Sequence, residues 1–184
     1  MGQRIGAAVF DSRTRDEIMV ARNEGGRSVY ANASRTRRRG LELSATGALS
    51  PRWRYALAWT ALQAREEATG ALIAGTAART GWAELRMAPR GEFVEGLELF
   101  LAAQGNSRIA ANDDNTSWAP GHASLDLGVE HRWRRGGSDW TAFLRVDNVL
   151  DRQRIGSVIV NDGNGRYFEP APGRTVQLGV RIGG

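Results

Sequence analysis

Residues 145–184 read RVDNVLDRQRIGSVIVNDGNGRYFEPAPGRTVQLGVRIGG, and this stretch decides the fold. It begins as an alternating strand, continues as a long loop rich in Gly, Asn, Asp and Pro, and returns as a second alternating strand. In the second strand Val176, Leu178 and Val180 alternate with polar or small residues. A period of two is typical of a strand with one apolar face. Because a two-residue turn is enough to pair such strands, the length of the loop needs its own explanation.

The same alternation recurs along most of the chain. The sequence WRYALAWTALQ places Trp53, Tyr55, Leu57 and Trp59 on one face of a strand, and small or polar residues on the other. We therefore predict an all-β fold, a meander of about eight antiparallel strands. Their expected ranges are residues 4–20, 28–49, 52–63, 79–88, 93–104, 122–134, 139–150 and 173–182.

The connections between these strands alternate in length. Tight turns are expected near Pro51, Pro89 and Gly136. The other connections are polar and mostly long, and they lie at residues 23–27, 64–78, 105–121 and 151–172. A soluble β-sandwich also alternates, but it hides its apolar face against a second sheet. A transmembrane β-barrel explains both features, because its apolar face meets lipid and its long loops share one end.

The barrel hypothesis assigns a direction to every strand residue. Leu57, Leu127 and Leu178 should face outward. The charged positions should line a wet lumen, as a wall of mixed sign and not as catalytic acids and bases: Arg54, Arg86, Arg132, Arg181, Glu42, Glu98, Glu130 and Asp126. Aromatic residues favour strands in any sheet, but five tryptophans at or near strand ends are expected to form interfacial girdles: Trp53, Trp82, Trp118, Trp133 and Trp140.

Composition excludes several other classes of protein. The chain has 184 residues and no Cys, which rules out disulfides and thiolate metal sites. Its net charge is +5, but the arginines are mostly interleaved with acidic residues, and Arg35 to Arg39 is the only dense basic run. We therefore predict no nucleic-acid partner. No window is apolar enough for a transmembrane helix, and residues 1–6 do not form a signal peptide, so an exported protein would need a further N-terminal segment.

The stretch from Arg145 to Arg174 closely resembles the C-terminal end of TonB-dependent outer-membrane receptors. Those receptors carry an Asn-Leu-Phe-Asp type motif, a long external loop with a Pro-Gly-Arg segment, and a closing strand. Here the two motifs are DNVLD at residues 147–151 and EPAPGR at residues 169–174. Upstream, Asp16-Glu17-Ile18 is followed by Arg38-Arg39-Gly40-Leu41-Glu42, which looks like the family's strand, loop and R-G-x-E strand.

The resemblance implies a fold, a function and a location. The family's barrel has 22 strands around a plug, so residues 1–184 look like its C-terminal segment, with the plug domain absent. The implied function is TonB-dependent uptake of a ferric siderophore or another metal chelate at the cell outer membrane. The implied partners are outer-membrane lipid, the metal-chelate ligand and, through the missing N-terminal part, the TonB energy-transducing complex. No cofactor is implied.

Several residues are candidates for specific roles. Arg166, Tyr167 and Phe168 in the last loop are predicted to contact an anionic chelate. The family-motif residues are assigned structural roles: Asp147, Asn148, Asp151, Pro170, Gly173 and Arg174. The oxygen-rich stretches 113–115 and 161–164 lack the pattern of an EF-hand, and His122 and His131 have no partnering ligands, so no metal site is predicted.

Two rival functions remain open at this stage. The first is a self-contained eight-stranded outer-membrane barrel with a structural or adhesive role, in which the first and last strands pair. The second is a barrel enzyme, for which Ser107, Ser117 and His122 lie in or beside one long loop. No catalytic motif surrounds these three residues, so we predict no enzymatic activity and no catalytic residues.

Overall fold

The computed structural model describes residues 2–91 and 94–184. Its regular elements are strands throughout, as predicted. In the described residues, no helix is sufficiently long and apolar to cross a membrane. The strands are β1 (Arg4–Glu24), β2 (Arg27–Ser50), β3 (Trp53–Glu66), β4 (Arg79–Met87), β5 (Leu97–Asn106), β6 (Ile109–Ala110), β7 (Trp118–Ala119), β8 (His122–Arg135), β9 (Ser138–Asp147), β10 (Ile155–Val158), β11 (Phe168–Pro170) and β12 (Thr175–Gly183).

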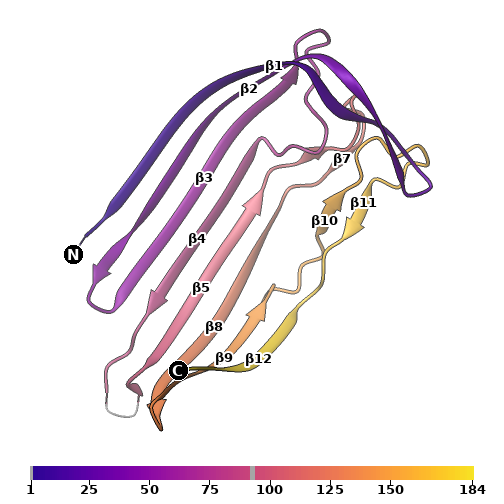
Figure 1. The fold of residues 1–184 in the computed structure, drawn as a ribbon. Helices are drawn as coiled ribbons and strands as arrows, with labels where there is room; N and C mark the ends of the chain where they lie inside the picture. The colour runs from indigo at the N-terminus through magenta and orange to yellow at the C-terminus, as the bar shows by residue number, and fades with distance from the viewer. Residues whose placement is uncertain (1, 92–93) are drawn as a thin grey trace.

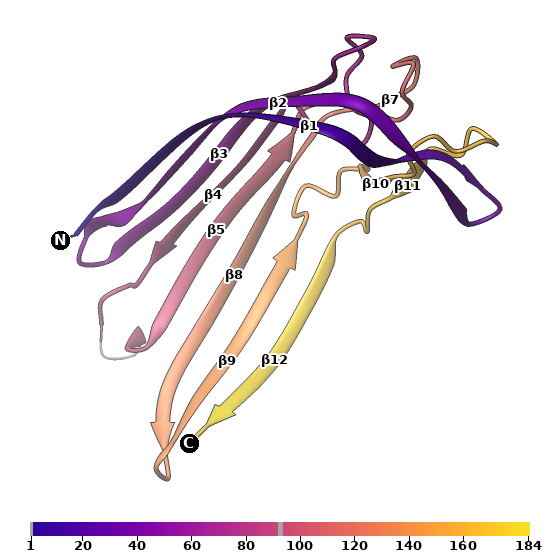
Figure 2. The ribbon, with the colours of Figure 1, turned by 45° about the horizontal axis from the view of Figure 1, so that its top comes forward.

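Eight of these strands form one antiparallel sheet. Its order is β1-β2-β3-β4-β5-β8-β9-β12, so each strand pairs with the next long strand along the chain. The sheet is strongly curved, like a section of a barrel wall (Figures 1 and 2). Strands β1 and β12 are the two edges, and the sheet does not close on itself. The structure therefore confirms the antiparallel meander, in the form of an open trough.

Most strand boundaries agree with the sequence within a few residues, and the exceptions have local causes. The predicted loop at residues 23–27 is a two-residue turn, Gly25-Gly26, in which both glycines have positive φ (56° and 76°). Strand β1 therefore continues to Glu24, four residues further than predicted, and β2 begins at Arg27. Strand β5 begins at Leu97 and not at residue 93, which lies outside the described residues. Strand β9 ends at Asp147 because Asn148 takes φ 52°.

The cross-strand register fixes which side chains share a face. Residues that pair directly in an antiparallel sheet lie on the same face, and faces alternate along each strand. Leu57 pairs with Ala83, and Leu127 pairs with Leu101 and Val146. Leu57, Leu127 and Leu178 share the apolar face and are 46%, 41% and 81% exposed. This agrees with the predicted outward direction of all three.

The polar face is the concave one. Its residues Glu98, Ser124 and Asp126 are only 5–8% exposed, although the sheet is a single layer. Side chains of a single layer become buried where the sheet curves around them and where a loop folds over them. Such a loop is present, because Arg154 donates a hydrogen bond from the β9–β12 connection to the Ser124 hydroxyl (3.2 Å). Arg54, Asp126 and Arg181 point to this concave side, as predicted.

Connections of different length lie at opposite ends of the sheet. The β3–β4, β5–β8 and β9–β12 connections are long and share one end with the tip of the β1–β2 hairpin (Figure 1). We call this the long-loop end. The connections after β2, β4 and β8 lie at the other end, which we call the short-turn end. Those after β2 and β8 are tight turns as predicted, but the one after β4 spans residues 88–96 and is longer than the tight turn predicted near Pro89. The two short pairs within the long loops, β6–β7 and β10–β11, were not predicted.

Three phenylalanines pack over glycines on the concave face. Phe10 pairs with Gly40, Phe100 with Gly128, and Phe143 with Gly179. A Cβ atom at any of these glycines would lie 2.2–2.5 Å from the phenyl ring opposite. An aromatic ring over a glycine on the neighbouring strand covers the exposed backbone and helps to fix the register. These contacts favour the observed pairing over a slipped one.

The tryptophan girdle is only partly as predicted. Trp53, Trp133 and Trp140 lie on the convex face near the short-turn end, and the last two rings stack with centroids 6.0 Å apart. The prediction was wrong for the other two. Trp82 pairs with Ala58 and Gln104 and therefore faces the concave side. Trp118 lies in β7, inside a loop, where its indole N–H donates to the Asn115 carbonyl.

Candidate functional site

A network of ion pairs centred on Glu98 crosses the concave face. Glu98 accepts hydrogen bonds from Arg54 on β3 and from Arg86 on β4, the latter at 2.7 Å. Arg132 on β8 lies 3.9 Å away and also pairs with Glu130 at 2.7 Å. The Glu98 side chain is only 10% exposed. One carboxylate therefore joins guanidinium groups from three strands, and we call this set the concave-face network.

A second group of charges extends the network towards the long-loop end. The Arg145 guanidinium pairs with Asp147 and lies 3.4 Å from Asp126. The Phe100 ring lies between the two groups, with the guanidinium carbons of Arg86 and Arg145 at 5.2 and 5.6 Å from its centroid. Cation–π contacts of this kind add to the ion pairs that hold the two guanidinium groups. The concave face is thus lined by fixed charges of both signs.

Sequence reasoning found most members of this wall but not their pairing. Arg54, Arg86, Arg132, Glu98 and Glu130 come together as described. Glu42 and Arg181 lie on the same face, but no ion pair joins either of them to another described residue. Glu84 was missed, although it pairs with Arg86 at 2.6 Å. Glu84 lies two residues before Arg86 on β4, and this alternation would have placed both side chains on the concave face.

A pocket opens on the concave face beneath the long loops, and we call it the concave pocket. It has a volume of about 370 Å³. Its lining combines an aromatic ring, polar side chains and two basic groups: Thr60, Thr80, Trp82, Gln104, Asn106, His122 and Arg154. His122 Nδ1 and Arg154 Nε are buried and have no hydrogen-bond partner in the described part of the chain. Buried polar atoms without partners are costly, so these two nitrogens are available to hydrogen-bond a ligand in the pocket.

The loops above this pocket are joined by asparagine side chains into one unit, which we call the loop cap. Asn161 donates to the Val20 carbonyl (2.7 Å) and exchanges two hydrogen bonds with Asp113 (2.8 and 3.0 Å). Asn115 exchanges two with the backbone of Leu72 (2.7 and 2.9 Å). Asn23, at the tip of the first hairpin, donates to the Val160 carbonyl in the last loop (2.7 Å). The first and last loops therefore meet above the trough.

Six of the eight buried apolar residues of the described chain lie in this loop cap and at its base. Five of the six are alanines, and all six are 0–7% exposed: Ala64, Ile73, Ala74, Ala110, Ala111 and Ala119. Such loops pack by their own side chains, as compact surface loops do. The loop cap is therefore well packed, and it can hold polar groups in fixed positions.

The β1–β2 hairpin carries a partly buried ion pair beyond the apolar part of the sheet. Arg38 donates two hydrogen bonds to Glu17, at 2.7 and 2.8 Å, and the buried Thr36 hydroxyl also donates to this carboxylate. The hydrogen bonds from Arg38 hold the pKa of Glu17 below its ordinary value. This contact stabilises the hairpin at neutral pH, and it is lost as the pH falls through that lowered pKa.

The DNVLD segment forms the turn that starts the last loop. Asn148 is fully buried, and its amide N–H donates to Asp126 (2.9 Å). Its side chain also bonds the backbone of Arg152 in both directions (3.0 and 3.1 Å). Asp151, also at positive φ, accepts from the Arg174 amide (2.8 Å) and thereby joins the two ends of the loop. These contacts support the structural role assigned to the segment.

Replacing Asn148 by Ala should destabilise the folded protein by about 2 kcal/mol. Ala tolerates the left-handed conformation poorly, and the side-chain hydrogen bonds to Arg152 disappear. Urea unfolding of the protein in lipid vesicles measures the loss. Asn164→Ala serves as the control, because Asn164 is exposed in the same loop, and it should change the unfolding free energy by less than about 0.5 kcal/mol. Equal effects of the two variants would contradict a structural role for Asn148.

The other motif residues and the predicted ligand contacts lie along the same loop. Pro170 pairs with Ile155, and a Cβ at Gly173 would lie 3.1 Å from the Asp151 carboxylate. Arg166 and Phe168 are exposed, and Tyr167 is half-buried with its ring 6.0 Å from that of Phe168. The three predicted contacts are thus adjacent, but they do not line the concave pocket. Sequence reasoning missed Arg154, for which a basic residue in a long loop was the only signal.

The oxygen-rich loops use their acceptors internally. Asp113 and Asn161 bond each other, and Asp162 accepts from the amides of Asn164 and Arg166 (3.1 and 2.7 Å). No cluster of three acidic or histidine residues suited to a metal occurs in the described residues. The Ser107 hydroxyl accepts from the Arg79 amide (3.0 Å), and the Ser117 amide donates to Asn112. The His131 ring forms a hydrogen bond with the Glu95 carbonyl (3.0 Å).

Comparison with known proteins identifies the architecture. A family model described as "TonB dependent receptor-like, beta-barrel" matches residues 2–149. The ferric yersiniabactin uptake receptor FyuA from Yersinia pestis superposes with a TM-score of 0.77 at 20% identity, over 98% of this chain and 27% of that chain. The siderophore receptor PiuA from Acinetobacter baumannii gives 0.72 at 14% identity, over 98% of this chain and 26% of that chain.

The copper transporter OprC is also similar, with a TM-score of 0.74 at 16% identity, over 97% of this chain and 28% of that chain. At these identities the likeness concerns the fold. The chain spans about a quarter of the length of each solved structure it matches. The trough therefore matches one part of each of these larger structures.

Proposed function

Because the chain belongs to the TonB-dependent receptor-like β-barrel family, we propose that it forms eight wall strands and the outward loops of an outer-membrane receptor that imports metal chelates. The convex apolar face then meets lipid, and the concave polar face lines the wet interior. The long-loop end faces outward and receives the ligand. This placement accounts for the length of the β9–β12 connection, which forms part of the loop cap.

The observation that supports this proposal best is the concave pocket. It lies below the loop cap, where a ligand entering from outside would arrive. Arg154 and His122 each present a buried nitrogen without a partner, and Trp82 supplies an aromatic surface. A guanidinium group and an aromatic ring suit an anionic chelate with planar aromatic donors, such as a ferric catecholate siderophore. Arg166 and Phe168 are exposed in the last loop, with the half-buried Tyr167 between them, and in this proposal the three residues contact the ligand before it reaches the pocket.

The proposed receptor has no catalytic role. Import requires energy, and in this proposal the TonB energy-transducing complex supplies it through a plug domain. The eight strands and their loops contribute the ligand contacts and the passage.

A self-contained eight-stranded barrel is the alternative. In such a barrel β1 and β12 pair, and side chains fill the interior. Here β1 and β12 are separate edges of an open trough, with the concave pocket between the strands and the loops. This arrangement favours a section of a larger wall over the small barrel.

Uptake of labelled iron tests the proposal. The full-length protein is expressed in cells that lack other siderophore receptors, and ferric tris-catecholate and ferric carboxylate complexes carrying radioactive iron are supplied. We expect energy-dependent uptake of at least one of them. Arg154→Gln should lower uptake at limiting concentration about tenfold, because a charged hydrogen-bond donor is lost.

Arg152→Gln is the matched control. Arg152 is exposed in the same loop, and its side chain does not line the concave pocket, so uptake should stay within about twofold of the unmodified protein. Absence of uptake of every complex would contradict the receptor function. Normal uptake by the Arg154→Gln variant would contradict the assigned pocket only.

A further inference from the structure

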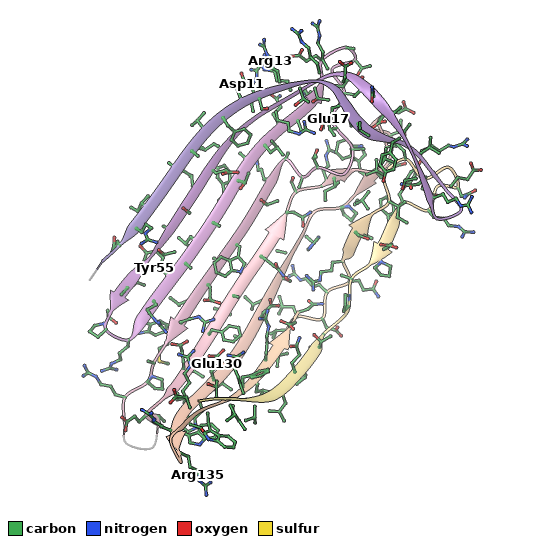
Figure 3. The ribbon with its side chains drawn as sticks, in the orientation of Figure 1. Asp11, Arg13, Glu17, Tyr55, Glu130 and Arg135 are labelled. Carbon is green, nitrogen blue, oxygen red and sulfur yellow. The ribbon has the colours of Figure 1, made fainter. Side chains whose placement is uncertain are left out.

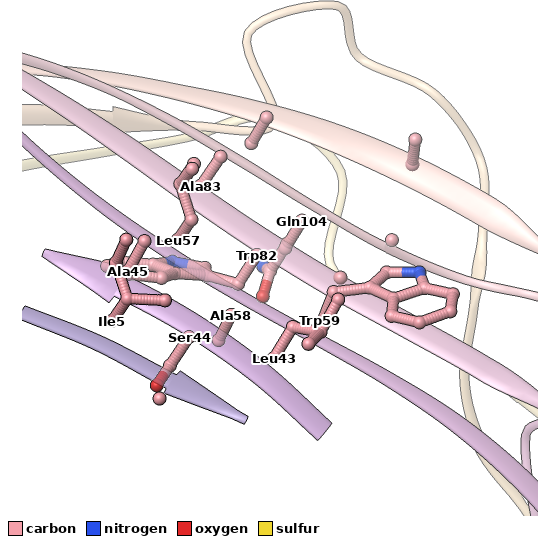
Figure 4. Close-up of a pocket in the computed structure, with 15 residues that line it drawn as sticks. Ile5, Leu43, Ser44, Ala45, Leu57, Ala58, Trp59, Trp82, Ala83 and Gln104 are labelled. Atoms are coloured by element: carbon pink, nitrogen blue, oxygen red, sulfur yellow. The ribbon is translucent and has the colours of Figure 1, made fainter. Parts of the chain in front are cut away.

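The wall of the trough holds many of its polar side chains in place. In Figure 3, Glu17 projects to the inner side of β1, where Arg38 and Thr36 bond its carboxylate. The outer side presents hydrocarbon instead. An apolar hollow of about 610 Å³ lies there, and Leu57 and Trp59 belong to its convex-face lining, which is entirely apolar (Figure 4). A covalent change that needs no enzyme is therefore expected in the loops.

The asparagines of the chain differ in how firmly their side chains are held. The chain has eight of them. Six use the side-chain amide in hydrogen bonds with other described residues: Asn23, Asn106, Asn112, Asn115, Asn148 and Asn161. The side chains of Asn32 and Asn164 form no such bond within the described part of the chain, and both residues are exposed. These two amides are therefore free to react with a neighbouring group.

The residue that follows each of these two asparagines separates them. Gly165 follows Asn164, and no other asparagine of the chain precedes a glycine. A glycine nitrogen can approach the preceding side chain, because no Cβ blocks it and its backbone rotates freely. Asn32 precedes Ala33 and pairs with Ile18 in the sheet, which keeps its backbone extended. Asn164 is therefore the more reactive of the two.

The turn around Asn164 is held loosely at the atom that matters. The Gly165 amide donates to the Asp162 carbonyl at 3.2 Å, the long end of the range for such bonds. The Asp162 carboxylate accepts from the amides of Asn164 and Arg166 (3.1 and 2.7 Å). An ionised and bonded carboxylate resists attack by an amide nitrogen, so Asp162 is less reactive although Gly163 follows it. Opening one exposed hydrogen bond frees the Gly165 nitrogen.

We propose that Asn164 is a site of spontaneous deamidation. The Gly165 nitrogen loses its proton to solvent and attacks Cγ of Asn164, which forms an N–Cγ bond and closes a succinimide ring. The Cγ–Nδ2 bond breaks, and the nitrogen takes up a proton and leaves as ammonia. One water molecule then opens the ring at either carbonyl. The products are aspartate, or isoaspartate, in which the main chain runs through the former side chain and is one methylene longer.

The consequence for ligand capture rests on the proposed function. Arg166 is exposed two residues after Asn164, and it begins the segment that contacts the chelate first in that proposal. A new carboxylate at position 164 lies within reach of Arg166 and reduces its attraction for an anionic ligand. The isoaspartate form also lengthens the main chain just before Tyr167 and Phe168. Deamidation therefore weakens capture as the protein ages.

Mass spectrometry of the ageing protein tests the modification and needs no ligand. The full-length protein in detergent is incubated at mildly alkaline pH, sampled over several days and cleaved after its arginines. The peptide of residues 155–166 should gain about 1 Da, and an isoaspartate-specific methyltransferase should label it. Fragmentation of this peptide distinguishes Asn164 from Asn161. We expect conversion at Asn164 to be about tenfold faster than at Asn32, the exposed internal control.

Gly165→Ala tests the route of the reaction. The added Cβ hinders the attacking nitrogen, so conversion at Asn164 should become about tenfold slower. Equal rates at Asn164 and Asn32 in the unmodified protein would overturn the proposal. Undiminished conversion in the Gly165→Ala variant would overturn it as well, because the nitrogen of residue 165 would then not be the attacking atom.

Two variants test the effect on capture without ageing. Asn164→Asp carries the new charge, whereas Asn164→Gln keeps a neutral amide of similar size. At limiting ferric tris-catecholate, cells carrying Asn164→Asp should import about fivefold less radioactive iron than cells carrying Asn164→Gln, because an exposed ion pair engages Arg166. Equal uptake by the two variants would overturn the effect on capture. Absence of uptake by both would contradict the receptor function, while the rates at Asn164 and Asn32 would still decide the modification.

Discussion

Leu127→Arg is expected to destabilise the protein in a lipid bilayer by about 2–4 kcal/mol. Leu127 lies in the middle of the convex residues of β8, between Ala123 and Trp133 along that face. It pairs with Leu101 and Val146, so its neighbours on this face are apolar too. An arginine at mid-depth has no water and no carboxylate to contact. Urea titration of the protein in phosphatidylcholine vesicles measures the change in unfolding free energy.

Ser44→Arg is the control for this prediction, because it introduces the same side chain on the concave face. Ser44 is exposed there and pairs with Gly6 and Ala58, which leave room for a long side chain. The arginine then remains hydrated, so the cost should stay below about 1 kcal/mol. If the two variants lose the same stability, the convex face does not meet lipid.

The strands and their faces were predictable from sequence, because the two-residue period of the apolar pattern indicates both a strand and the face on which each side chain lies. Alternation at Leu127 and Leu178 fixes a strand and also fixes which neighbours share a face. The tryptophans show the limit of this argument. Trp82 was assigned to a girdle from its position near a strand end, yet its parity within β4 places it on the concave face. Applying the alternation to Trp82 would have avoided this error.

The sites were less predictable because they depend on contacts between distant segments. Glu98 and Arg54 are 44 residues apart, and only the register of three strands brings them together. Arg154 reaches the concave pocket from a loop whose path no local pattern specifies. Charged residues also alternate on both faces beyond the apolar band, so sequence alone does not separate Arg39 from residues of the interior. The loop cap depends on single asparagine side chains such as Asn161, which composition identifies only as loop formers.

Glu98→Gln is expected to destabilise the protein by about 2–3 kcal/mol, because it leaves the guanidinium groups around it without their shared carboxylate. Removing one partner of a buried ion pair costs about 3–5 kcal/mol. We expect a smaller cost here because the Arg54 and Arg132 side chains are 58% and 55% exposed and can become hydrated. The Arg86 side chain is only 27% exposed, so most of the lost stability comes from leaving its charge without Glu98. Arg86 keeps its pair with Glu84, which limits its loss.

The control for Glu98→Gln is Glu42→Gln, the same chemical change at an exposed position of the same face, and it should alter the unfolding free energy by less than about 0.5 kcal/mol. A double-mutant cycle with Arg86→Gln then isolates the pair. If Glu98 acts through Arg86, the double variant should recover part of the loss, with a coupling of about 1–2 kcal/mol. Strict additivity of the two substitutions would contradict a network centred on Glu98. It would mean that each concave-face charge is stabilised by water alone, as on an ordinary exposed surface.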